Sequence, residues 1–266
     1  MKEKNTLITI LLLATLIFFS GCNKEKDNLS SGKENEIRLV SSITQYGNND
    51  EGEATFTRTE YSYDNLNRIT EMTSIAEGIT SRLFYSYPEE NIMLLETSDL
   101  LYSSITYILN DDGSISSYSN GDKIMEVCTY SNGFLQKKET DIGFESSQSK
   151  SIENFTWENG TITSAEVISH AQLIFTYTLT YEYGEIENKL CSIDFYLTDF
   201  ISPRGWYGKS IPYMPSKITF HSDLNGSGQS VSTYRYEIDE KGYITKIFVK
   251  LNDNNEELRT IIEYAD

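Results

Sequence analysis

The chain has 266 residues and a formal net charge of −18, and it contains 19 Tyr and 12 Phe but only four Pro. The acidic balance argues against a nucleic-acid partner and against adsorption to anionic lipid, since both require a basic surface. The abundance of aromatic residues is typical of β-strands, so we expect an all-β protein. No cofactor and no metal are expected, because no Cys pair at zinc spacing and no phosphate-binding Gly loop occurs.

The N-terminus has the features of a lipoprotein signal. A basic start precedes an apolar run, Leu7–Phe19, of about 13 residues, whereas a membrane-spanning helix needs roughly 20. Ser20-Gly21-Cys22 resembles the lipobox at which bacterial lipoprotein signal peptidase cuts. We therefore expect residues 1–21 to be a signal peptide and Cys22 to carry the lipid that anchors the protein to a membrane. The alternative is an ordinary secreted protein with a chance cysteine.

Residues 22–36 are polar and charged, so they are predicted to form a flexible tether. The acidic Glu25 and Asp27 resemble the export signal that sends Bacteroides-type lipoproteins to the outer face of the outer membrane. Cell-surface display is therefore expected, with the periplasmic face as the alternative. Residues 37–266 are long enough to form a single β domain.

This domain repeats a strand–turn–strand phrase. The segments Tyr61–Thr70 and Tyr236–Thr245 match nearly position for position, and shorter copies turn at Asn132-Gly133 and Asn159-Gly160. Asn-Gly is the dipeptide that type I′ hairpin turns prefer, because both central residues need positive φ. The repeat spacing indicates about seven β-hairpins.

Between the turns, apolar and polar residues alternate. Residues 175, 177, 179, 181 and 183 are aromatic or Leu, whereas the residues between them are Thr or Glu. Such alternation indicates half-buried antiparallel strands. We expect about 14–16 strands of antiparallel up-and-down hairpins, forming a soluble barrel-like or strongly curled sheet that hides its edges. A transmembrane barrel is disfavoured, because the faces opposite the aromatic residues are Thr, Ser and Glu rather than an apolar band.

Two cysteines remain after Cys22. Cys128 and Cys191 both lie in strand-like runs. An extracytoplasmic compartment permits a disulfide between them, and two buried free thiols are the alternative that the sequence leaves open.

The segment Asp199–Lys217 breaks the hairpin rhythm and holds three of the four prolines. Long structured loops on rigid sheets often carry function, so this segment is the candidate ligand-binding site. Its aromatic residues could stack on a sugar or another flat ligand, while its basic residues supply donors. The alternative is that the aromatic residues plug the end of the barrel. The candidate residues are Arg204, Trp206, Tyr207, Lys209 and Tyr213.

The hairpin phrase resembles the tyrosine-aspartate repeat of bacterial secreted shells. Tyr63-Asp64 and Arg68-Ile69 match that repeat, and Asn67 stands where it has Gly. The lipobox, the polar tether, the Tyr-rich hairpins and the phrase Gly205–Thr219 also resemble a family of Bacteroides-type lipoproteins, which has a domain of unknown function with a porin-like β fold. This resemblance implies an architecture and a location, since the family has no established activity.

No catalytic residue is predicted. His221-Ser222-Asp223 is not a triad, because neighbours in a strand point to opposite faces, and the Asp223–Ser227 segment is a polar turn rather than a calcium loop. The favoured function is a non-enzymatic, lipid-anchored module of the cell envelope that binds a glycan or a small-molecule ligand. The alternatives are a structural or adhesive surface component and, less favoured, a glycan-acting hydrolase.

Overall fold

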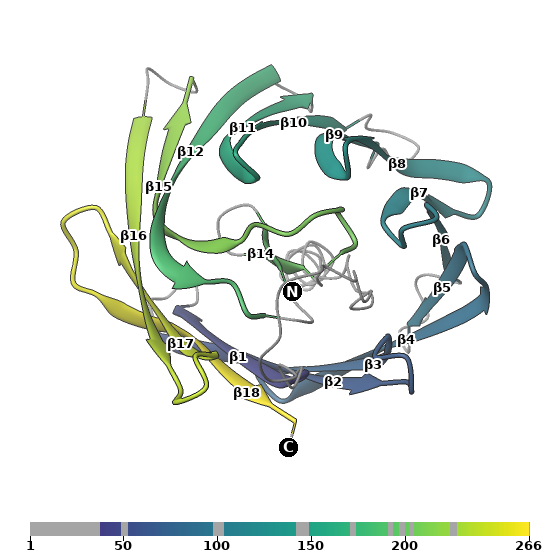
Figure 1. Cartoon of the computed structure of the whole chain (residues 1–266), viewed down its shortest axis with the longest axis horizontal. Coiled ribbons are helices and arrows are strands. Elements are labelled where there is room, and N and C mark those ends of the chain that lie inside the picture. Colours follow the sequence, from purple (N-terminus) through teal and green to yellow (C-terminus); the bar gives the residue numbers. More distant parts are fainter. Residues whose placement is uncertain are drawn as a thin grey trace, which may run out of the picture.

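The computed structural model describes residues 38–48, 53–97, 104–141, 149–170, 174–190, 194–196, 200–202, 205–223 and 228–265. Sixteen antiparallel strands form a closed barrel, which Figure 1 shows from one end as a ring. Each of these strands pairs with the barrel strands before and after it in the chain, with β12 followed by β15, and β18 pairs with β1 to close the ring. The predicted all-β antiparallel fold is confirmed, and of the predicted forms the closed barrel is the one observed.

The wall strands are β1 (Val40–Asn48), β2 (Ala54–Tyr63), β3 (Ile69–Ala76), β4 (Ile79–Glu89), β5 (Ile92–Thr97), β6 (Ile105–Leu109), β7 (Ile115–Asn120), β8 (Lys123–Ser131), β9 (Phe134–Asp141), β10 (Lys150–Glu158), β11 (Thr161–His170), β12 (Ile174–Glu187), β15 (Tyr213–Ser222), β16 (Gly228–Ile238), β17 (Ile244–Leu251) and β18 (Glu257–Tyr264). A second, two-stranded sheet pairs β13 (Asp194–Tyr196) with β14 (Phe200–Ser202). Among the described residues, no helix is long and apolar enough to cross a membrane. The predicted signal peptide and tether lie outside the described residues.

The short turns have the predicted geometry. Asn132 and Gly133 have φ of 54° and 80°, and Asn159 and Gly160 have φ of 52° and 80°, as type I′ turns require. Asn67, which stands in the turn after Tyr63-Asp64, also has positive φ at 62°. Asn tolerates this conformation better than most residues, so Asn67 suits the turn.

The alternation along each strand separates an inner face from an outer face. On β12, Leu179 is 1% exposed and the tyrosines on the same face pack against the buried core, whereas Thr180 and Glu182 are exposed. On β4, Leu83 and Tyr85 are buried, and Phe84 between them is 40% exposed. The aromatic face that the sequence predicts is therefore the inner surface of the barrel, which we call the lumen.

A repeated hydrogen bond ties the hairpins together at the end of the barrel where the short turns lie. In the described part of the chain, seven hairpins share it: an aromatic side chain at or near the end of one strand donates to a backbone carbonyl at or near the start of the preceding wall strand. We call this contact the aromatic latch. The pairs are Tyr63 to Val40, Tyr87 to Ile69, Tyr130 to Ile115, Trp157 to Leu135, Tyr183 to Ile162, Tyr236 to Pro215 and Tyr264 to Ile244. The latch explains why the phrase repeats an aromatic residue just before each turn; on β6 that position is Leu109.

Removal of one latch hydroxyl should destabilise the barrel. The Tyr236 hydroxyl donates to the Pro215 carbonyl at 2.6 Å, so Tyr236→Phe leaves that carbonyl without this donor. We expect the free energy of unfolding in urea to fall by about 1–2 kcal/mol. Tyr213→Phe is the matched control, because Tyr213 is 43% exposed and its loss should change stability by less than about 0.5 kcal/mol. Equal effects of the two substitutions on the free energy of unfolding would show that the aromatic latch contributes nothing to stability.

Between β12 and β15 the chain leaves the wall. The described residues between them, 188–190, 194–196, 200–202 and 205–212, are called the lumenal insertion; they include β13 and β14, and Figure 1 shows β14 inside the ring of strands. It is fixed to the latch end of the barrel, where Ile115 N donates to the Trp206 carbonyl and Lys209 N donates to the Gly133 carbonyl, both at 2.7 Å. The segment predicted as one loop, Asp199–Lys217, therefore divides: its C-terminal part from Tyr213 belongs to the wall strand β15.

Candidate functional site

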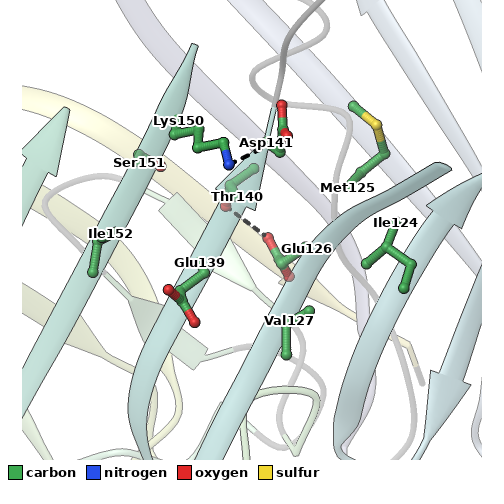
Figure 2. A pocket seen from close by; sticks show the side chains of 10 residues that line it. All are labelled: Ile124, Met125, Glu126, Val127, Glu139, Thr140, Asp141, Lys150, Ser151 and Ile152. Carbon is green, nitrogen blue, oxygen red and sulfur yellow. Dashed lines mark hydrogen bonds and ion pairs between the residues drawn. The ribbon is translucent and has the colours of Figure 1, made fainter. Parts of the chain in front are cut away.

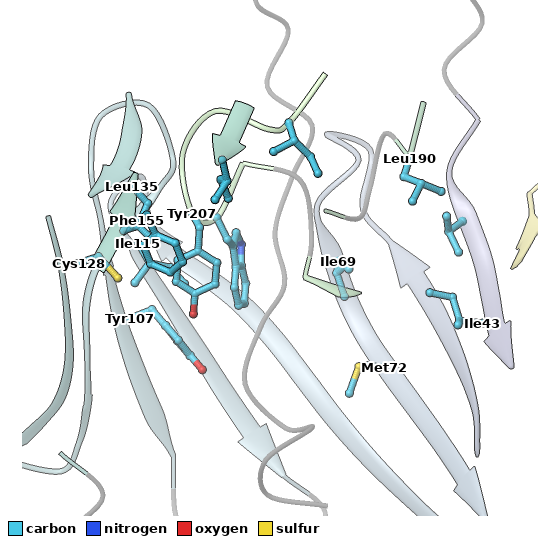
Figure 3. Close-up of a cluster of buried hydrophobic side chains, with 14 of the residues drawn as sticks. Ile43, Ile69, Met72, Tyr107, Ile115, Cys128, Leu135, Phe155, Leu190 and Tyr207 are labelled. Carbon is cyan, nitrogen blue, oxygen red and sulfur yellow. The ribbon is translucent and has the colours of Figure 1, made fainter. Parts of the chain in front are cut away.

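Two of the predicted binding residues lie deep inside the barrel. Trp206 is 0% exposed and Tyr207 is 4% exposed. The Trp206 ring lies 5.4 Å from the ring of Tyr107 and 6.2 Å from the ring of Tyr85, measured between centroids. Figure 3 shows Tyr207 and Tyr107 in the same buried cluster. Trp206 and Tyr207 thus fill the interior, as the plug alternative describes.

The other predicted residues have different surroundings. Lys209 is exposed, and its Nζ lies 5.2 Å from the centroid of the Phe134 ring. Tyr213 is 43% exposed at the start of β15. Arg204 lies outside the described residues. The four described candidates are therefore divided between a buried pair and an exposed pair.

The structure brings together three charged side chains that sequence reasoning did not single out. Glu126 on β8, Lys138 on β9 and Glu153 on β10 are 2%, 8% and 8% exposed, and they come from three adjacent strands. We call them the ionic trio. A signal was present in the sequence: Glu126 alternates with Cys128 and Tyr130, and Glu153 alternates with Phe155 and Trp157, so both carboxylates share a face with aromatic residues.

Lys138 connects the two carboxylates electrostatically. Its Nζ lies 2.9 Å from Glu153 Oε1. Burial alone would lower the pKa of Lys138, but the charges of Glu153 and Glu126 outweigh burial, so its pKa is raised and the ammonium is retained. Nζ also lies 5.4 Å from the centroid of the Tyr207 ring. The trio therefore holds a charged lysine in the interior of the barrel.

Glu126 links the trio to the lumenal insertion. The Tyr207 hydroxyl donates to Glu126 Oε1 at 3.2 Å, Cys128 Sγ donates to the same oxygen at 3.7 Å, and Thr140 Oγ1 donates to Oε2 at 3.4 Å. Burial raises the pKa of Glu126, an effect that the charge of Lys138 partly offsets. The insertion is thus held in place partly by an internal carboxylate.

The raised pKa of Glu126 predicts a pH dependence of stability. The folded protein retains the Glu126 proton to higher pH than the unfolded chain, so stability should fall as the pH rises from the ordinary to the raised pKa. Glu126→Gln removes this contribution. As the pH rises above the ordinary pKa of a glutamate, the unfolding free energy of the wild type minus that of Glu126→Gln should decrease. Urea unfolding at several pH values measures the difference, and an increase with pH would contradict the predicted direction.

Cys128 is a buried free thiol. Burial and the nearby charge of Glu126 raise its pKa, which makes the thiol unreactive at neutral pH. Cys191 lies outside the described residues. Of the two possibilities that the sequence left open, the structure therefore has the free thiol at Cys128.

Part of the lumen remains accessible. Several inward aromatic side chains pack against the core but are only partly buried: Tyr61, Tyr63, Tyr87, Tyr130, Trp157, Tyr177, Tyr181, Tyr183, Phe220 and Tyr236. Barrels of about 16 strands are too wide for their own side chains to fill. Within the described residues, Tyr107 Oη, Tyr181 Oη and Glu153 Oε2 are among the buried polar atoms that have no hydrogen-bond partner. The lumen therefore combines aromatic surface with unused hydrogen-bonding groups.

A cavity of about 170 Å³ lies in the wall between β8, β9 and β10. Its lining includes Glu126, Thr140, Asp141 and Lys150, as Figure 2 shows. Asp141 is ion-paired with Lys123 at 3.3 Å and with Lys150 at 3.9 Å. Among the described residues, no group of three or more His, Cys, Asp or Glu is placed to hold a metal ion.

Comparison with known proteins shows which solved structures have a similar fold. No family model matches the chain, and no curated protein matches it. Among solved structures, the chain is similar to a porin-like protein from Bacteroides uniformis, with a TM-score of 0.58 and 14% identity, over 85% of this chain and 96% of that chain. It is also similar to a porin-like protein from Bacteroides vulgatus, with a TM-score of 0.57 and 13% identity, over 86% of this chain and 99% of that chain. The expected porin-like fold is thereby confirmed.

Proposed function

We propose that this chain is a non-enzymatic protein of the cell envelope, anchored by lipid on Cys22, that binds a small ligand inside its barrel. The lipobox-like sequence before Cys22 and the polar tether after it support the anchor. The porin-like folds of Bacteroides proteins support an envelope location. The observation that carries the proposed binding function is the partly exposed aromatic lumen beside the ionic trio.

The outer wall of the barrel favours an aqueous surrounding. Charged side chains of nearby strands pair on it, either between adjacent strands or, for Arg58 and Glu263, across β1, whereas a membrane barrel presents an apolar band to lipid. The outer pairs include Arg58–Glu263 at 2.8 Å, Arg82–Glu71 at 3.7 Å, Lys217–Glu182 at 2.7 Å and Lys246–Glu237 at 2.7 Å. A barrel of this kind fits a role outside the bilayer, with the lipid on Cys22 as its attachment.

The lumenal insertion favours binding over transport. An open pore requires a continuous channel, but the insertion lies within the ring and its backbone is bonded to the latch end at Ile115 and Gly133. The lumen is therefore obstructed on that side. A barrel that is obstructed at one end and has partly exposed tyrosines inside is suited to binding a small molecule.

A ligand array tests the binding function. The full chain, purified in mild detergent, would be screened against glycans, lipids and small organic molecules. Tyr177→Ala changes the lumen, where the Tyr177 ring lies 5.2 Å from the ring of Phe220, and Phe84→Ala is the matched control on the outer wall. We expect a ligand whose binding is lost in the first variant and retained in the second. Absence of any ligand, or equal binding by both variants, would refute lumenal binding.

The lipid anchor has its own test. Cys22→Ala removes the predicted acylation site, so the protein should leave the membrane fraction and appear as a soluble species. Fractionation followed by immunoblotting measures the distribution. Retention of the variant in the membrane fraction would contradict the anchor.

Hydrolysis is the second candidate, because Glu126 and Glu153 form a pair of desolvated carboxylates whose environments differ. Both carboxylates are engaged: Glu126 accepts from Tyr207 and Thr140, and Glu153 binds Lys138. A hydrolase needs both groups to face a substrate, so the geometry favours binding. Release of nitrophenol from nitrophenyl glycosides by the wild type, and its loss in Glu126→Gln, would reverse this conclusion.

A further inference from the structure

We propose that two copies of this protein associate through the outer wall of β6–β10 and form a symmetric dimer. The inference goes beyond the lumenal binding function and does not depend on it, because it concerns the opposite face of the wall. It is carried by the order of the outward side chains on these strands, by the cavity among them and by their charges.

A row of outward residues crosses the five strands. Each of these residues lies next to a buried residue of the lumenal face, and neighbouring strands are about 4.8 Å apart, so the row is a continuous strip of roughly 19 Å. Ile108 is 39% exposed and Val127 is 41% exposed. We call this row the outer strip, and its successive cross-strand partners on β6 to β10 are Ile108, Ser117, Val127, Glu139 and Ile152.

The order of residues in the outer strip is symmetric about Val127. An isoleucine stands at each end, and the polar Ser117 and Glu139 stand on either side of the valine. A twofold axis that runs along β8, between the two copies, therefore places Val127 on itself and Ile108 of each copy on Ile152 of the other. The strip is thus self-complementary, as the interface of a twofold dimer requires.

The same axis places serines of β7 opposite carboxylates of β9. Ser117 faces Glu139 of the second copy, and its hydroxyl can donate to that carboxylate. Two residues farther from the latch end, Ser119 faces Asp141 in the same way. Ile124, the cross-strand partner of Ser119, is 60% exposed and lies on the axis. Two successive levels of the wall therefore fit one axis.

The cavity between β8, β9 and β10 provides a recess in this surface. Ile124, Val127 and Ile152 are among the residues that line it, as Figure 2 shows. Ile108 of the second copy lies opposite Ile152, so its side chain can enter the recess. The volume of about 170 Å³ is sufficient, since a cavity of about 150 Å³ holds a benzene molecule. Insertion would remove both isoleucines from water.

The local charge favours a second copy as the partner. The chain has 40 acidic and 22 basic residues, so two copies repel each other on average. In contrast, the charged residues of the outer strip and of the positions two residues to either side of it are balanced: Glu139, Asp141, Lys137 and Lys150. Two copies can therefore meet at this face without net repulsion. Lipid is a poorer partner, because these charges oppose contact with acyl chains.

The dimer should be weak. The wall is curved, as the ring in Figure 1 shows, so only the strands near β8 come into contact, and interfaces of small area associate weakly. Attachment of many copies to one membrane would raise their local concentration. Because the proposed axis runs along a strand, it keeps the latch ends of both copies on the same side, as attachment to one membrane requires.

Cross-linking at the axis tests the proposal. Val127→Cys, in the full chain at high concentration in mild detergent, would be treated with a short bismaleimide, since packed sheets lie about 10 Å apart. We expect a covalent dimer in several-fold higher yield than from Phe84→Cys, the matched control, because Phe84 is 40% exposed on the outer wall of β4. The wild type reports the background from native cysteines. Equal yields from the two variants would overturn the proposal.

A mixture of variants tests the symmetry. Ile108→Cys and Ile152→Cys face each other in different copies, whereas each lies about 19 Å to the side of its own counterpart. The mixture should therefore give more covalent dimer than either variant alone. Equal yields from the mixture and from the separate variants would overturn the axis along β8.

A charge at the axis should dissociate the dimer. Sedimentation in density-matched detergent should give the wild type twice the mass of one chain at high concentration, and Val127→Glu the mass of one chain. Phe84→Glu should behave as the wild type. A wild type that is monomeric at every concentration would overturn the proposal. If that monomer bound phosphatidylethanolamine vesicles and Val127→Glu did not, the outer strip would be a lipid contact instead.

Discussion

Trp206→Ala should lower the free energy of unfolding by about 3–5 kcal/mol. Trp206 is 0% exposed, and its ring packs against those of Tyr107 and Tyr85 inside the barrel. Truncation to Ala would leave a large cavity in a region where the wall strands cannot collapse, because each is fixed by hydrogen bonds to two neighbours. Equilibrium unfolding in guanidinium, followed by circular dichroism, measures the loss.

Lys209→Ala is the control for this substitution. Lys209 belongs to the same insertion but is exposed, so its loss should change stability by less than about 1 kcal/mol. A small effect of Trp206→Ala would mean that the tryptophan contacts solvent or ligand rather than the core. The interpretation of Trp206 as a residue that stacks on a ligand would then replace its interpretation as part of a buried plug.

Lys138→Met should also destabilise the protein strongly. The substitution removes the partner of Glu153 and leaves that buried carboxylate without a compensating charge. Breaking a buried ion pair from one side costs about 3–5 kcal/mol, since the remaining charge is desolvated and unpaired. Thermal and denaturant unfolding at neutral pH would show the loss.

The adjacent residue supplies a control with the same chemistry. Lys137 pairs with Glu139 at 2.9 Å on the outer wall, where both side chains are more than one-third exposed. Exposed pairs contribute about 0–1 kcal/mol, so Lys137→Met should be nearly neutral. If Lys137→Met were the more damaging of the two, the inward and outward faces of β9 would be assigned incorrectly.

The β9 strand shows where sequence reasoning stops. Strict alternation from the buried Leu135 would place Lys137 inside and Lys138 outside. The pairing of β8 with β9 shifts register between Thr129 and Tyr130, and this irregularity places Leu135 and Lys138 on the same side. A register shift depends on contacts with the neighbouring strand, so a local pattern could not predict that Lys138 meets Glu153.

The overall fold was predictable because its signals are local. Asn-Gly turns and aromatic alternation each act within one hairpin, and the barrel repeats that hairpin along the chain. The aromatic residues of the insertion were recognised, but their direction was not predictable. Trp206 and Tyr207 could face a ligand or the core, and long-range contacts with Tyr107 and Glu126 decide which.

Closure of the barrel is the claim on which the lumen, the buried plug and the ligand site all depend. Thr44 on β1 and Ile261 on β18 are cross-strand partners, and paired strands hold such residues at a Cα separation that suits a disulfide. A Thr44→Cys/Ile261→Cys variant, oxidised mildly and mapped by mass spectrometry after proteolysis, tests the closure directly. The account predicts a disulfide joining the first and last strands in the folded monomer. A folded monomer in which these two cysteines remain unpaired would contradict it.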